Sequence, residues 1–130
     1  MKVETGQNAR FEKARIPDDV YPAIFKGTRE IKDGKYGKRA AFLFEVDYNG
    51  NKIELAKLVY IKKATPKNDI GTVMMALGAA LDGKEVDIDS FIGTRCRVVV
   101  EDYDYDDNGT KKIASTIDKV KSIADRPLTV

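Results

Sequence analysis

The segment that decides the fold is DVYPAIFKGTREI, which runs from Asp19 to Ile31. Its length and its β-branched and aromatic residues are typical of a long strand. Gly27 stands inside this pattern, and a glycine within a strand indicates a sharp bend or a β-bulge. We therefore expect a first strand that bends at Gly27, as happens where one strand serves two sheets of a barrel.

Two more strands are expected after this segment. The loop KDGKYGK, residues 32–38, leads into RAAFLFEVDY, residues 39–48, where alternate positions are strongly apolar. The better inward set there is Ala40, Phe42, Phe44, Val46 and Tyr48. Asn49-Gly50 is a strong signal for a tight hairpin, so residues 51–62 return as a third strand. The inward set of that strand is Ile53, Leu55, Val59 and Ile61, with Lys57 at an edge or a bulge.

The hydrophobic period changes after the third strand and predicts one helix. Apolar residues now recur at intervals of three and four, at Ile70, Val73, Met74, Leu77 and Leu81. Thr65 followed by Pro66 is a typical helix start, and Gly83 is a typical stop. We expect the apolar stripe to pack on the core, because the strands need a cover at one end.

Two final strands complete the pattern. The inward face of the fourth strand, residues 94–103, carries Cys96, Val98 and Val100. The fifth strand runs from about Thr110 to Ile123, and its apolar residues Ile117 and Val120 lie three positions apart. That spacing departs from strand alternation and predicts a bulge.

The connection between these strands, VEDYDYDDNGTKKI, resembles a calcium-binding loop for six residues. From Asp104 it supplies the first ligands and the glycine of an EF-hand, but the twelfth position is Ser115 where the loop needs a bidentate glutamate. The eighth position is also polar, being Lys111, and the flanking segments are strands. Asn108-Gly109 favours a hairpin turn. We therefore expect an acidic β-hairpin at this place and no metal or other cofactor.

Composition excludes several classes of function. The chain of 130 residues has a formal net charge of +2 although 34% of its residues are charged, so the net charge alone does not indicate nucleic acid. It has no histidine and one cysteine, Cys96, which rules out zinc sites of the usual kind, a Ser-His-Asp triad and an internal disulfide. Carboxylate pairs such as Asp87 with Asp89 have no evident base or nucleophile beside them, so we do not expect an enzyme.

The same features predict the location of the protein and its division into segments. A single cysteine is typical of a reducing, intracellular protein, and we expect a cytoplasmic one. No apolar run approaches the roughly 20 residues that span a bilayer, and the first segment lacks the apolar centre of a signal peptide. We expect an N-terminal arm at residues 1–17, one domain at residues 18–124 and a C-terminal tail at residues 125–130.

The order of elements is strand, strand, strand, helix, strand, strand. Together with the bent first strand, it predicts an all-β domain with one helix: a five-stranded Greek-key barrel of the OB-fold type, with the helix between the third and fourth strands. An open α+β sheet with the helix on one face is the alternative. Between about Tyr21 and Ile123 the chain resembles the OB-fold single-stranded DNA-binding proteins, particularly the small ones of phages and archaea. The resemblance rests on YPAIFKG, on KYGKRAAFLFEV and on IDSFIGTRCRVVV followed by a glycine-containing hairpin.

This resemblance implies a function and a binding surface. The ligand would lie across the second and third strands, between the loops at residues 32–38 and 102–109. The function would be non-catalytic, largely sequence-independent binding of single-stranded DNA in replication, recombination or repair, with RNA as the other possible ligand. Cations that follow phosphates and rings that stack on bases are the chemistry such a site needs. The candidate residues are Lys35, Tyr36, Lys38, Arg39, Lys57, Tyr60, Lys62, Lys63, Arg95, Arg97, Tyr103 and Tyr105.

The acidic hairpin at residues 101–107 leaves a second hypothesis open. Its aspartates would repel phosphate, so we expect its tip to point away from the groove. Alternatively the domain is a structural adaptor that binds a basic partner protein through this hairpin. The sequence leaves the oligomeric state open, a homo-oligomer included.

Overall fold

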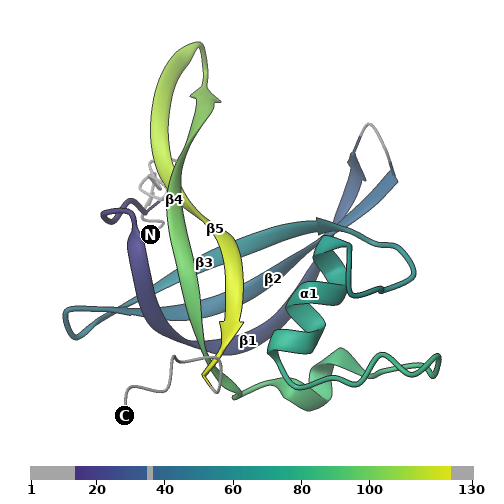
Figure 1. Ribbon diagram of the computed structural model, residues 1–130. Coiled ribbons are helices and arrows are strands. Elements are labelled where there is room, and N and C mark those ends of the chain that lie inside the picture. The colour runs from purple at the N-terminus through teal and green to yellow at the C-terminus, as the bar shows by residue number, and fades with distance from the viewer. Residues whose placement is uncertain (1–13, 35–36, 124–130) are drawn as a thin grey trace, which may run out of the picture.

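The computed structural model describes residues 14–34 and 37–123 and is mostly β (Figure 1). Its elements are β1 (Asp19–Gly34), β2 (Gly37–Tyr48), β3 (Asn51–Tyr60), α1 (Asp69–Ala76), the short 3₁₀ helix η2 (Ile88–Phe91), β4 (Arg95–Asp107) and β5 (Thr110–Ser122). The five strands form one antiparallel sheet in the order β3-β2-β1-β4-β5. The expectation of five strands and one α-helix is therefore confirmed for the described residues.

Strand β1 is the pivot of the sheet. Its first part, Asp19–Ile24, pairs with β4, and from Ala23 onward it pairs with β2. The register with β2 shifts between Phe25 and Gly27, and Gly27 has φ +121°, a conformation that favours glycine. The bend predicted at Gly27 is therefore confirmed, and Figure 1 shows β1 curving beneath the molecule.

The sheet curls until its two outer strands, β3 and β5, lie against each other. Two side-chain hydrogen bonds join them. The Lys57 ammonium donates to the carbonyl of Asp118 at 2.7 Å, and the Thr116 hydroxyl donates to the carbonyl of Ala56 at 3.2 Å. The result is a small barrel-like sheet in which both outer strands have partners.

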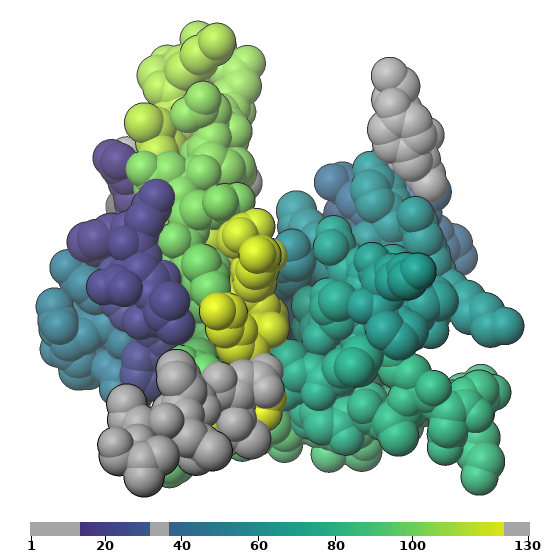
Figure 2. All heavy atoms as spheres, in the orientation of Figure 1, coloured from purple at the N-terminus to yellow at the C-terminus, as the bar shows by residue number. Residues whose placement is uncertain are grey.

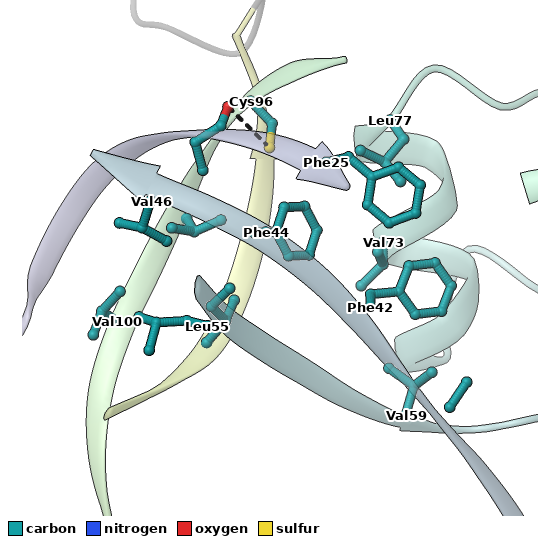
Figure 3. Close-up of a cluster of buried hydrophobic side chains, with 14 of the residues drawn as sticks. Phe25, Phe42, Phe44, Val46, Leu55, Val59, Val73, Leu77, Cys96 and Val100 are labelled. Carbon is teal, nitrogen blue, oxygen red and sulfur yellow. Dashed lines mark hydrogen bonds between the residues drawn. The ribbon is translucent and has the colours of Figure 1, made fainter. Parts of the chain in front are cut away.

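The core fills the inside of this curled sheet. Phe25, Phe42 and Phe44 are fully buried, and the ring centroid of Phe25 lies 5.7 Å from that of Phe42 and 5.4 Å from that of Phe44. Figure 3 shows Val73 and Leu77 of α1 facing these rings. The helix therefore covers one end of the sheet, and the expected core role of its apolar stripe is confirmed for these two residues.

Cys96 is also part of the core. Its thiol has no exposed surface and lies 3.8 Å from the carbonyl oxygen of Ala23, as drawn in Figure 3. Burial raises the pKa of the Cys96 thiol to about 12, so it stays protonated and unreactive at neutral pH. The sequence interpretation of Cys96 as a buried apolar residue is confirmed.

Both predicted hairpin turns are present. Asn49 and Gly50 have φ values of +52° and +85°, and Asn108 and Gly109 have +53° and +86°, as a type I′ turn requires. The ladder between β4 and β5 continues to the pair Asp107 and Thr110 at the turn. The acidic segment is therefore a hairpin, as expected. The expected bulge in β5 is present too, because Val99 pairs with Lys119 and Val100 with Ile117, which leaves Asp118 unpaired.

Two local predictions are wrong. The helix does not begin at Thr65 but at Asp69, with Asn68 as its N-cap, and it ends at Ala76 rather than near Gly83. The chain at Thr65 folds back over the first turn, so that a Cβ on Gly71 would lie 1.7 Å from the Thr65 carbonyl oxygen. Ile61 is 43% exposed rather than inward, because β3 has ended at Tyr60. No helix within residues 14–34 and 37–123 has the length and apolar character needed to cross a membrane.

Candidate nucleic-acid interface

A groove of about 490 Å³ lies over the outer face of β2 and β3. Arg29 and Ile31 of β1 line one side, and Tyr103 of β4 with Ser115 and Thr116 of β5 line the other. Figure 1 shows the β1–β2 and β4–β5 hairpins projecting to the same side of the molecule, and Figure 2 shows the surface hollowed between them. The two hairpins therefore act as the walls and the outer sheet face as the floor.

The middle of the floor is apolar. It consists of two cross-strand pairs, Ala41 with Leu58 and Leu43 with Ala56, whose side chains face outward because their neighbours Phe42, Phe44, Leu55 and Val59 face the core. Leu58 is 45% exposed. On the β1 side, Arg29 lies next to Ala41 in the ladder. Flat apolar surface beside an arginine suits the face of a base better than a phosphate.

One end of the floor carries the cations and a ring. Arg39 pairs with Tyr60 across the strands, and Ile61 continues the ladder by donating its N–H to the carbonyl of Lys38 at 2.9 Å. The Lys62 ammonium lies 6.0 Å from the centroid of the Tyr60 ring, within the range of a cation–π contact. The structure thus brings together four candidates from the sequence: Lys38, Arg39, Tyr60 and Lys62.

The β4–β5 hairpin divides its rings and its carboxylates between two faces. Tyr103 and Tyr105 are two positions apart on one strand, so they share a face, and their ring centroids are 5.9 Å apart. Because Tyr103 lines the groove, this face is turned toward it. Asp102, Asp104 and Asp106 alternate with the tyrosines and take the other face.

Arg15 holds the aspartate face at its base. Its guanidinium makes two hydrogen bonds to the Asp102 carboxylate, at 2.9 and 3.2 Å. This pairing raises the pKa of Arg15 and partly neutralises the carboxylate. Nearer the tip, Lys112 forms an ion pair with Asp107 at 3.0 Å. The hairpin is therefore less negative toward the groove than its sequence indicates.

The remaining candidates lie elsewhere or outside the described side chains. Lys35 and Tyr36 belong to the latter group. The ammonium of Lys57 is bound at the β3–β5 junction, away from the floor. Arg95 and Arg97 pair with Ile24 and Pro22 of β1 in the ladder, and Arg95 lines a separate hollow with Cys96 and Ile123. Lys63 is exposed in the segment after β3, where its carbonyl accepts a hydrogen bond from Asn68 at 2.8 Å.

Sequence reasoning missed three charged groups of this surface: Arg29, Glu45 and Glu54. Arg29 lies two residues after Gly27, and strand alternation counted from the bulge would have placed it outward beside Ala41. Glu45 and Glu54 fall in the outward sets of β2 and β3, and the register places them directly opposite each other. The short hairpin between these strands was the available signal for that pairing.

No protein-family model matches this chain, and no curated protein matches it significantly. The groove is therefore interpreted from its own chemistry, which is an apolar floor with rings and cations around it.

Proposed function

We propose that the chain is an OB-fold protein that binds single-stranded DNA without catalysis and with little sequence preference, in replication, recombination or repair. The strand order supports this fold. β3-β2-β1-β4-β5, with β5 against β3 and a bent β1 shared between two neighbours, matches a five-stranded Greek-key barrel. Such barrels bind oligonucleotides on the face of the second and third strands, between the two hairpin loops.

One observation carries the proposal of a nucleic-acid ligand. The rings of Tyr103 and Tyr60 lie along the same outer surface as Arg29 and Arg39, whereas the hairpin aspartates take the opposite face. Rings stack on bases with a contribution of roughly 1 to 3 kcal/mol each, and cations neutralise the phosphates between them. Without that division of the hairpin, its carboxylates would repel the phosphates of a strand in the groove.

Fluorescence anisotropy with labelled single-stranded DNA, single-stranded RNA and duplex DNA, each at two salt concentrations, tests the proposal. We expect the single strands to bind and the duplex to bind weakly. The affinity should fall with salt with a log-log slope of about 0.7 per phosphate contacted. The RNA arm decides which nucleic acid is preferred. If no single-stranded oligonucleotide is retained at low salt, the proposal is wrong.

A pair of charge reversals locates the site. Lys38→Glu with Lys62→Glu inverts the cationic end of the floor, and we expect the affinity for single-stranded DNA to fall by at least about tenfold, since each lost phosphate contact also reduces the salt slope. The matched control is Lys119→Glu with Lys121→Glu, which makes the same charge change on exposed positions of β5. Equal losses for both variants would show that net charge, rather than the groove, governs binding.

A second candidate function is supported by the aspartate face of the hairpin. Asp104 and Asp106 are exposed there, and Ile113, which pairs with Asp104, is 45% exposed. This combination suits a partner protein with a basic patch around an apolar contact. Asp104→Lys with Asp106→Lys should abolish such a protein complex while leaving DNA binding unchanged or stronger.

A further inference from the structure

We propose that Glu45 and Glu54 mark the end of the nucleic-acid site, so that the groove holds only a short stretch of a strand. This inference rests on the proposed function and adds the residues that limit the site. It concerns repulsion of phosphate by carboxylates that border an apolar floor.

The position of the two glutamates follows from the register. Moving along the floor, the pair Arg39 with Tyr60 is followed by two apolar pairs and then by Glu45 opposite Glu54. Glu54 lines the groove, and Glu45 lines the adjacent hollow that also contains Arg95. The two carboxylates therefore lie on the boundary between the two depressions.

The charge of this pair is not neutralised by the residues that the structure describes. Neither carboxylate forms a salt bridge or a side-chain hydrogen bond with any residue in 14–31 or 37–123. Asp47, two positions farther along β2, is different. Its carboxylate accepts the Gly50 N–H at 2.9 Å and binds Lys52 at 3.3 Å, and these contacts lower the pKa of Asp47. The Glu45–Glu54 pair thus presents two uncompensated charges to a strand that crosses the floor.

These charges oppose the cations at the other end. A phosphate near Arg39 gains attraction, and one near the Glu45–Glu54 pair meets repulsion from two carboxylates in a surface that is partly shielded from water. Arg39 and Glu45 are six positions apart on β2, a distance of about 20 Å at roughly 3.3 Å per residue. We therefore place the site size near the lower limit of the roughly 4 to 16 nucleotides that OB-folds occupy.

The test measures affinity against oligonucleotide length. With unlabelled thymidine oligomers of increasing length competing against one labelled strand at low salt, the wild-type affinity, corrected for the number of registers, should stop rising at about four nucleotides. The Glu45→Gln, Glu54→Gln variant should bind the longer oligomers about tenfold more tightly and the shortest ones less than twofold more tightly, with a salt slope steeper by about 0.7 to 1.4. The variant should fold, because it removes two like charges placed directly opposite.

The matched control is Asp104→Asn with Asp106→Asn, which removes the same charge from the hairpin face turned away from the groove. We expect it to leave the length at which affinity stops rising unchanged. Affinity that keeps rising without a break in the wild type would overturn the inference while leaving the proposed function intact. An equal gain at all lengths in the glutamate variant would overturn it as well. Absence of binding at every length would instead refute the proposed function, and the inference with it.

Discussion

Ser115 ties the first described residues to the barrel. Its hydroxyl, which is 6% exposed as a residue, accepts the Ile16 N–H at 2.8 Å and donates to the Ile16 carbonyl at 3.1 Å. The backbone N–H of Ser115 also donates to the carbonyl of Ala14 at 2.9 Å. These bonds hold Ile16 in the core, where it is 3% exposed. In the sequence Ser115 was informative only as a residue that cannot close a calcium loop.

Ser115→Ala should therefore destabilise the fold. The substitution leaves the buried N–H and carbonyl of Ile16 without their partner, which costs roughly 1 to 3 kcal/mol. Urea unfolding, followed by circular dichroism, measures this loss. Ser90→Ala is the control, because the Ser90 hydroxyl bonds the Asp87 carbonyl on an exposed turn, where water replaces it. A change below about 0.5 kcal/mol for Ser115→Ala would contradict the assigned role.

At the scale of the element, α1 is the part that the sequence described least well. Its apolar spacing was recognised, but its start was placed four residues too early, at the Thr65-Pro66 signal. Asn68 provides the cap instead, by accepting the Gly71 N–H at 2.9 Å and the Thr65 N–H at 3.1 Å. Two residues with capping ability stand close together here, and only the fold-back of the preceding loop selects between them.

Gly71→Ala tests this fold-back through the sign of its effect. Alanine normally stabilises a helix relative to glycine by about 1 kcal/mol. Here a Cβ would collide with the backbone of Thr65, so we expect a loss of roughly 1 to 3 kcal/mol or more in thermal or urea unfolding. The neighbouring exposed position supplies the control, since Thr72→Ala should change stability by less than about 0.5 kcal/mol. Stabilisation by Gly71→Ala would show that the loop does not pack on the helix.

The whole molecule depends on closure between β3 and β5. Lys57 contributes by binding the carbonyl of Asp118, which the β5 bulge leaves unpaired in the ladder. The sequence analysis placed Lys57 both at an edge or a bulge and among the nucleic-acid ligands. The structure gives its ammonium a partner within the barrel, and a charge committed in this way is a poor phosphate ligand.

Lys57→Met separates these roles. The variant keeps most of the apolar stem but leaves the Asp118 carbonyl without its donor, so we expect a loss of stability of roughly 1 to 3 kcal/mol. Its affinity for single-stranded DNA, measured by anisotropy, should stay within about twofold of wild type apart from the small effect of net charge. Lys63→Met, at an exposed position after β3, is the matched control for stability. A large loss of affinity in Lys57→Met with unchanged stability would reverse this assignment.

The sequence by itself determined the elements and their order. Alternation, Gly27, the two Asn-Gly turns and the helical stripe are local signals, because each depends on residues a few positions apart. The tertiary structure alone decided which charged side chains share a surface. Arg29 joined the groove through the β1 bulge, Glu45 met Glu54 through the β2–β3 register, and Lys57 was withdrawn by closure. Such relations join strands that are distant in the chain, and their geometry is set only when the sheet curls and packs.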